Sequence, residues 1–140
     1  MREILDAVAA GDLDPAEAEA KLRGYTSTEA GRFDAARTRR SGVPEAILAD
    51  GKTPAEIETL TEASIETTGR AIVTRLDDET AGALEEHLRE TRPSLTVTRH
   101  DRARALTART DSFEGPDLAA TVGVVTAGTA DRTPAGEAAL

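Results

Sequence analysis

The sequence predicts an α/β fold. Short apolar segments typical of strands alternate with longer segments of helical spacing, in the order strand, helix, strand, helix, strand. Two of the predicted helices also have clear start signals. Right-handed crossovers would place both helices on one face of the sheet. A small helical hairpin precedes this unit, and the first β-turn-α of a doubly wound domain follows it.

Residues 1–25 predict the helical hairpin. Apolar residues from Ile4 to Val8 have helical spacing, and Gly11 ends the first helix. The sequence Asp-Pro-Ala-Glu at 14–17 is a capping box that opens a second helix to about Arg23. A DNA-binding helix-turn-helix is the alternative, but acidic residues line both helices.

Residues 26–109 predict the α/β domain. Its predicted strands are 47–48, 71–74, 95–98 and 103–107. One helix begins at the capping box Thr-Pro-Ala-Glu of 53–56, and another begins at 77–79. The predicted buried positions along these helices are Ile57, Leu60, Ile65, Leu76, Ala83, Leu84 and Leu88. His87 is expected on a helix surface and His100 in a turn, and neither has a second ligand at metal-binding spacing.

Two basic features are candidate anion contacts. If the stretch 32–40 is helical, Arg37 and Arg40 share a face at i,i+3 spacing; the alternative is a solvated face that pairs with acids. Gly51-Lys52-Thr53 resembles the end of a P-loop but lacks its earlier glycines. A turn at Gly51 and a helix cap at Thr53 explain it better, and Lys52 remains a possible anion contact.

The last thirty residues predict a linker followed by a nucleotide site. Residues 110–120 lack periodicity and contain Gly-Pro, which is typical of a linker. Residues 122–125 predict a strand, followed by a tight turn and a helix capped by Thr133 with Pro134 at its first position. Such an arrangement exposes backbone N–H groups that can bind phosphate. The predicted contacts in this turn are Gly128, Thr129 and Asp131.

Composition excludes several function classes. The 140 residues carry 26 acidic and 17 basic side chains, a net charge of −9, which argues against nucleic acid as a partner. The acidity and the scarcity of lysine indicate adaptation to high salt or, equally, a genome that favours arginine codons. There is no cysteine, and aromatic content is 2%. No apolar run could cross a membrane and no signal peptide is evident, so a cytoplasmic location is expected.

Four motifs in register resemble one family over nearly the whole chain. They are Arg37-x-x-Arg40-x-Gly42-x-Pro44-Glu45, Gly51-Lys52-Thr53-Pro54, Thr74-Arg75, and Val124-Val125-Thr126-Ala127-Gly128-Thr129-x-Asp131. This pattern is similar to that of LarB, the nickel-pincer cofactor biosynthesis family. The resemblance implies an N-terminal α/β domain joined to a C-terminal domain like aminoimidazole ribonucleotide (AIR) carboxylase.

The resemblance also implies chemistry on a nucleotide. LarB-type enzymes carboxylate nicotinic acid adenine dinucleotide with carbon dioxide or bicarbonate and cleave its phosphoanhydride, giving pyridinium-3,5-biscarboxylic acid mononucleotide and AMP. Gly128, Thr129 and Asp131 match the family's nucleotide-binding turn. A cysteine later in the carboxylase-like domain adds to the pyridinium ring. The family forms homo-oligomers, and no membrane partner is implied.

Three departures from the family pattern bear on activity. The chain has no cysteine, Ala130 replaces a frequent serine, and Gly136 replaces a common glutamate. Only about 20 residues (121–140) match a carboxylase-like domain that needs on the order of 100–150. We therefore expect a truncated or split LarB, inactive alone, whose partner is the missing carboxylase-like domain and whose residues after about Ala120 are exposed or poorly ordered.

Two other functions stay open at this level. The chain could be a non-catalytic module for partner binding or oligomerisation, or an AIR carboxylase-related nucleotide-binding protein that uses only the turn near Gly128. The sequence leaves open whether the chain is itself an enzyme. It assigns no catalytic residue, no metal ligand and no cofactor to this chain.

Overall fold

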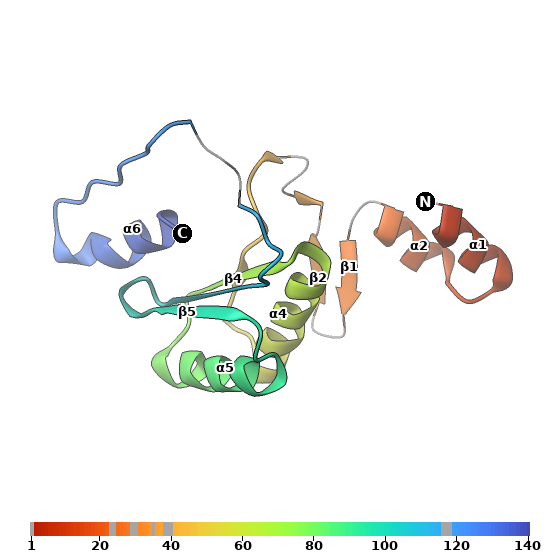
Figure 1. Ribbon diagram of the computed structural model, residues 1–140, viewed down its shortest axis with the longest axis horizontal. Coiled ribbons are helices and arrows are strands. Elements are labelled where there is room, and N and C mark those ends of the chain that lie inside the picture. The colour runs from red at the N-terminus through yellow and green to blue at the C-terminus, as the bar shows by residue number, and fades with distance from the viewer. Residues whose placement is uncertain (1, 23–24, 29–30, 35, 38–40, 116–118) are drawn as a thin grey trace.

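The computed structural model describes residues 2–22, 25–28, 31–34, 36–37, 41–115 and 119–140, and it confirms the mixed α/β architecture (Figure 1). The helices are α1 (Arg2–Ala10), α2 (Pro15–Leu22), α4 (Pro54–Thr68), α5 (Asp78–Thr91) and α6 (Arg132–Ala138), with short 3-10 helices η1 (Asp101–Ala103) and η2 (Thr129–Asp131). The strands are β1 (Tyr25–Thr28), β2 (Gly31–Asp34), β3 (Ile47–Leu48), β4 (Arg70–Thr74), β5 (Thr96–His100) and β6 (Ala105–Arg109).

A four-stranded sheet in the order β3-β4-β6-β5 forms the centre of the α/β unit. β3 and β4 are parallel, with α4 between them in the chain. β6 pairs antiparallel with both β4 and β5, so Val73 of β4 lies between Ile47 and Leu106. The predicted alternation of strands and helices is confirmed, and β6 adds a returning strand between β4 and β5.

Helices α4 and α5 cover one face of this sheet, as the crossover argument predicts (Figure 1). The core between helices and sheet is aliphatic, because successive strand residues alternate between the two faces. Its most buried members include Ile57, Ile65, Val73, Leu84, Leu88 and Leu106. One predicted core position is wrong: Ala83 is exposed, and Ala81 is buried in its place.

The start and end of α4 follow from its sequence. The hydroxyl of Thr53 accepts the Glu56 N–H at 3.3 Å, and the Glu56 carboxylate accepts the Thr53 N–H at 2.7 Å. This capping box is confirmed. Gly69 ends the helix with φ 75° and donates its N–H to Ile65 O at 2.9 Å, a left-handed conformation that favours glycine.

The amino-terminal segment contains one predicted and one unpredicted element. The hairpin of α1 and α2 is confirmed, and Figure 1 shows it at one end of the molecule. The basic stretch expected from residue 32 overlaps a strand: residues 31–34 form β2. This strand pairs antiparallel with β1. Phe33 of β2 is 3% exposed and joins the core beside α4.

The carboxyl-terminal segment differs from its prediction. Residues 122–125 form no strand, and Val122 and Val125 are 86% and 95% exposed. The expected exposure after Ala120 holds through Asp131. The final helix begins at Arg132, one residue before the predicted cap Thr133. In the described part of the chain, every helix is too short or too polar to cross a membrane.

Candidate functional site

The carboxyl ends of β3 and β4 lie side by side because these strands are parallel, and ligands of open α/β sheets bind at such edges. Arg75, which directly follows β4, contacts two acids from different segments. Its Nη1 lies 3.3 Å from Asp50 Oδ2, and its Nε lies 3.8 Å from Glu137 Oε1. This edge therefore joins the loop after β3, the end of β4 and helix α6.

Two arginines at this edge adopt left-handed backbone conformations. Arg75 has φ 61° and Arg104 has φ 51°, which is uncommon for residues with a side chain. The guanidinium of Arg104 donates from Nε to Leu76 O at 2.9 Å, and the Leu76 N–H donates to Arg104 O at 2.9 Å. These bonds hold both residues in place, and strain of this kind clusters at functional sites.

At the start of each helix that follows this edge, a carboxylate accepts a backbone N–H. The backbone N–H and the side chain of Thr53 hold the pKa of Glu56 below its ordinary value of 4.5. The Thr80 N–H, which donates to Asp77 Oδ1 at 2.7 Å, lowers the pKa of Asp77 below 3.8 in the same way. Both carboxylates are therefore ionised at neutral pH and occupy the helix starts. The interpretation of Gly51-Lys52-Thr53 as a turn and a cap, not a P-loop, agrees with this geometry.

The predicted anion contacts lie near an acid. Arg37 Nη1 forms an ion pair with Glu45 Oε2 at 3.1 Å. Lys52 and Glu45 line the same small cavity, of about 230 Å³, together with Phe33. Arg40, the third predicted contact, lies outside the described residues. At Arg37, the structure therefore shows the alternative given for the basic stretch, an ion pair with an acid.

The predicted nucleotide turn lies in an exposed segment. Thr129 and Asp131 belong to η2, and Asp131 precedes α6 without a side-chain capping bond. A methyl group built on Gly128 would lie 3.9 Å from Asp131 Oδ2, so the carboxylate lies over the glycine. Among the described residues, no hydrogen bond or ion pair joins this turn to Arg37 or Lys52.

A larger cavity occupies the sheet face that α4 and α5 leave uncovered; we call it the open-face cavity. Its volume is about 860 Å³. Its wall includes Val43, Ala46, Arg70, Ile72, Thr74, Phe113, Glu114, Glu137 and Leu140. Wall residues 42–46 overlap one of the motifs that resemble the family, and Thr74 begins another. Glu137 lies in the segment that follows the turn motif, which ends at Asp131. No local sequence pattern selects Arg70 or Phe113, since only the pairing of β4 with β6 brings them together.

The two histidines contact different partners. His87 Nε2 lies 3.5 Å from Glu62 Oε1, across α4 and α5. His100 was expected in a turn but ends β5, where its Nε2 lies 3.0 Å from Thr107 Oγ1. In the described ranges, no group of three or more His, Cys, Asp and Glu side chains could hold a metal ion.

Comparison with known proteins identifies the domain. A family model described as the LarB/PurE-like N-terminal domain matches residues 25–110. An uncharacterised protein of Methanocaldococcus jannaschii is 31% identical over 142 aligned positions, which cover 99% of this chain and 54% of that protein. The chain thus spans about half the length of the curated relative that it matches. Because the family model covers more than half of the chain, this protein belongs to the LarB/PurE-like N-terminal domain family.

Proposed function

We propose that this chain supplies the N-terminal portion of a LarB-type enzyme, which carboxylates and hydrolyses nicotinic acid adenine dinucleotide in nickel-pincer cofactor biosynthesis. The observation that carries the proposal is the family match over residues 25–110. The match of residues 124–131 to the family's nucleotide turn adds to it. In this proposal Gly128, Thr129 and Asp131 contribute to a nucleotide site, and Arg37, Arg40 and Lys52 are possible anion contacts.

The chain alone is proposed to be inactive. Carboxylation in this family needs a thiolate to add to the pyridinium ring, and this chain contains no cysteine. The thiol must then come from a carboxylase-like domain, which we propose as the partner of this chain. The family's substrates, nicotinic acid adenine dinucleotide and carbon dioxide or bicarbonate, would react at that partner.

A domain exchange tests this function. The N-terminal domain of an active LarB enzyme is replaced by residues 25–110 of this chain, and product formation from nicotinic acid adenine dinucleotide and labelled bicarbonate is measured. We expect the chimera to form the biscarboxylic acid mononucleotide and AMP. A control chimera with an unrelated α/β domain should form neither. A folded chimera without product would contradict the proposal.

A second function, partner binding without catalysis, is favoured by one observation. Val122, Val124 and Val125 are exposed in a segment without regular secondary structure. An exposed apolar segment commonly marks an interaction surface. If this is the function, replacing Val122 and Val125 by aspartate should abolish association with a carboxylase-like domain in sedimentation experiments, while the chimera above would be inactive.

A further inference from the structure

We propose that the open-face cavity binds a small organic anion, whose carboxylate or phosphate group pairs with Arg70 and whose flat apolar body lies along Ile72 toward Thr74. This inference goes beyond the proposed function and does not depend on it. Three features of the cavity support it: an arginine with no counter-ion among the described residues, a buried hydroxyl with no hydrogen-bond partner among them, and apolar side chains between the two.

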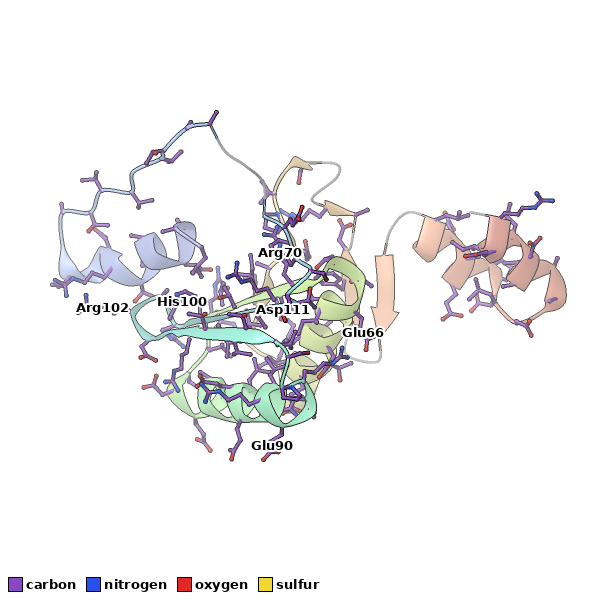
Figure 2. The ribbon with its side chains drawn as sticks, viewed as in Figure 1. Glu66, Arg70, Glu90, His100, Arg102 and Asp111 are labelled. Carbon is purple, nitrogen blue, oxygen red and sulfur yellow. The ribbon has the colours of Figure 1, made fainter. Side chains whose placement is uncertain are left out.

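Arg70 is the proposed anchor. The residue is half-buried, and among the described residues no carboxylate lies within ion-pair distance of its guanidinium. Its Cζ lies 4.8 Å from the centre of the Phe113 ring, which orients the guanidinium through a cation–π contact. Figure 2 shows Arg70 on the opposite side of the sheet from Glu90 of α5.

The environment of Arg70 favours an anion. Burial lowers the pKa of Arg70, and no neighbouring carboxylate offsets this effect. A desolvated cation without a partner is unfavourable, and a bound carboxylate or phosphate would relieve it through paired, charge-assisted hydrogen bonds. Arg75 and Arg92, by contrast, already contact acids.

Thr74 marks the other end of the cavity. It is 2% exposed, and its hydroxyl has no hydrogen-bond partner in the described part of the chain. Buried hydroxyls are normally paired, so this group is available to a ligand. Arg70 and Thr74 lie four residues apart on one face of β4, which separates their Cα atoms by about 13 Å.

The wall between these ends is apolar. Ile72 lies between Arg70 and Thr74 on the same strand face, and Val43 and Leu140 also line the cavity. Two acids also line the cavity: Glu137 contacts Arg75 at 3.8 Å, and Glu114, next to Phe113, is exposed to solvent. A volume of about 860 Å³ lies within the range of small-molecule sites. The ligand therefore has one anionic end, an apolar body and room for a hydroxyl or amino group near Thr74.

Binding of three aryl probes to the whole chain tests the inference. Benzoate and phenyl phosphate carry the two candidate anionic groups, and benzamide is the uncharged control. Each is titrated to roughly 10 mM while backbone amide resonances are followed by NMR. We expect at least one anion to shift the resonances of Ile72, Thr74 and Phe113 with a Kd of about 1 mM, as is typical of ligands with roughly ten non-hydrogen atoms. Benzamide should bind at least about tenfold more weakly.

Variants separate this site from general charge effects. Arg70→Gln should weaken anion binding about tenfold or more. Arg89→Gln makes the same charge change on α5, where the exposed Arg89 pairs with Glu85, and should leave binding unchanged. Thr74→Val keeps shape and fold and should weaken binding of a hydroxyl-bearing probe, 3-hydroxybenzoate, more than that of benzoate.

Two results would overturn the inference: no shift with either anion, or equal binding by the wild type and Arg70→Gln. Binding of benzoate alone or of phenyl phosphate alone would assign the cavity to carboxylates or to phosphates. Because the domain exchange measures product formation in a chimera, its failure would leave these titrations unaffected. Failure of the titrations would likewise leave the proposed function standing.

Discussion

Thr74 is the residue at which stability and binding conflict most directly. Its hydroxyl is buried with no hydrogen-bond partner among the described residues, and such a group costs about 1–3 kcal/mol. We predict that Thr74→Val raises the free energy of unfolding by about 1 kcal/mol, measured by urea denaturation.

The control for this prediction is another buried threonine. Thr61 is 0% exposed, but its hydroxyl donates to Ile57 O at 2.7 Å. Thr61→Val should therefore lower the free energy of unfolding by about 1 kcal/mol. If both variants changed stability in the same direction, the hydroxyl of Thr74 would not be the unsatisfied group that the structure indicates.

Single residues were predictable where a local rule decides them. Thr53, Gly51 and Asp77 adopt the expected cap and turn roles because capping depends on neighbours within four residues. Ala83 was misplaced because the buried stripe of α5 follows i, i+3, i+7 spacing, which Ala81, Leu84 and Leu88 satisfy. Arg70 could not be selected from the sequence. Its contact with the Phe113 ring, and the lack of a carboxylate near it among the described residues, both depend on tertiary packing.

At the scale of the element, α5 depends on an ionised cap. The pKa of Asp77 is lower in the folded state, so its contribution to stability is complete above the unfolded pKa, near 3.9, and is lost as pH falls through the folded value. Asparagine caps helices about as well but does not titrate. We predict that Asp77→Asn unfolds with nearly unchanged free energy at pH 7.

The acid limb distinguishes this variant from the wild type. Between about pH 4 and pH 2, Asp77→Asn should lose less stability than the wild type in thermal unfolding followed by circular dichroism. Asp6→Asn, an equal charge change at an exposed position of α1, is the control. If the wild type and Asp77→Asn lost the same stability over this pH range, the cap would not respond to pH.

Helix α6 contacts η1 through a glycine. A methyl group built on Gly136 would lie 2.9 Å from Ala103 Cβ, closer than side chains approach. Overpacking of this kind costs about 1–3 kcal/mol, while alanine favours a helix by up to about 1 kcal/mol. We predict that Gly136→Ala moves α6 away from η1, with amide exchange in α6 about fivefold faster.

A matched glycine serves as the control for α6. Gly123 has open space around it, so Gly123→Ala should leave the exchange of α6 unchanged. An unshifted Ala103 methyl resonance in Gly136→Ala would contradict the prediction. The glutamate common at this position in LarB-type sequences would meet the same obstacle, so its replacement by glycine permits this contact.

Elements were predictable to the extent that their signals are local. Helices α4 and α5 have caps and apolar stripes, and their expected starts are correct. The insertion of β6 between β4 and β5 is a choice among pairings that no local pattern specifies. Residues 122–125 have the composition of a strand, but a strand needs a partner, and no described segment pairs with it.

At the scale of the whole molecule, function and stability both involve the charge imbalance. The net charge is −9, yet the open-face cavity contains Arg70, which has no counter-ion in the part of the chain that the structure describes. An anion that enters must approach an acidic surface, so its association should accelerate as salt screens the repulsion.

The fold class and the placement of the helices were predictable from the sequence. The open-face cavity was not, because it forms only where α6, Phe113 and β4 come together, and no local sequence pattern indicates that contact.

Screening also predicts how salt changes stability. At pH 7 the excess of acids repels itself, and the Debye length shortens from about 10 Å at 0.1 M to about 3 Å at 1 M salt. Salt weakens ion pairs as well, but exposed pairs such as Arg89–Glu85 contribute little. We therefore expect NaCl to raise the free energy of unfolding at pH 7, by on the order of 1 kcal/mol, in urea denaturation. At pH 4.7, the sequence pI, repulsion between like charges no longer dominates, and the same salt should have no effect or reduce stability. An equal increase at both pH values would mean that salt acts through apolar burial and not through charge.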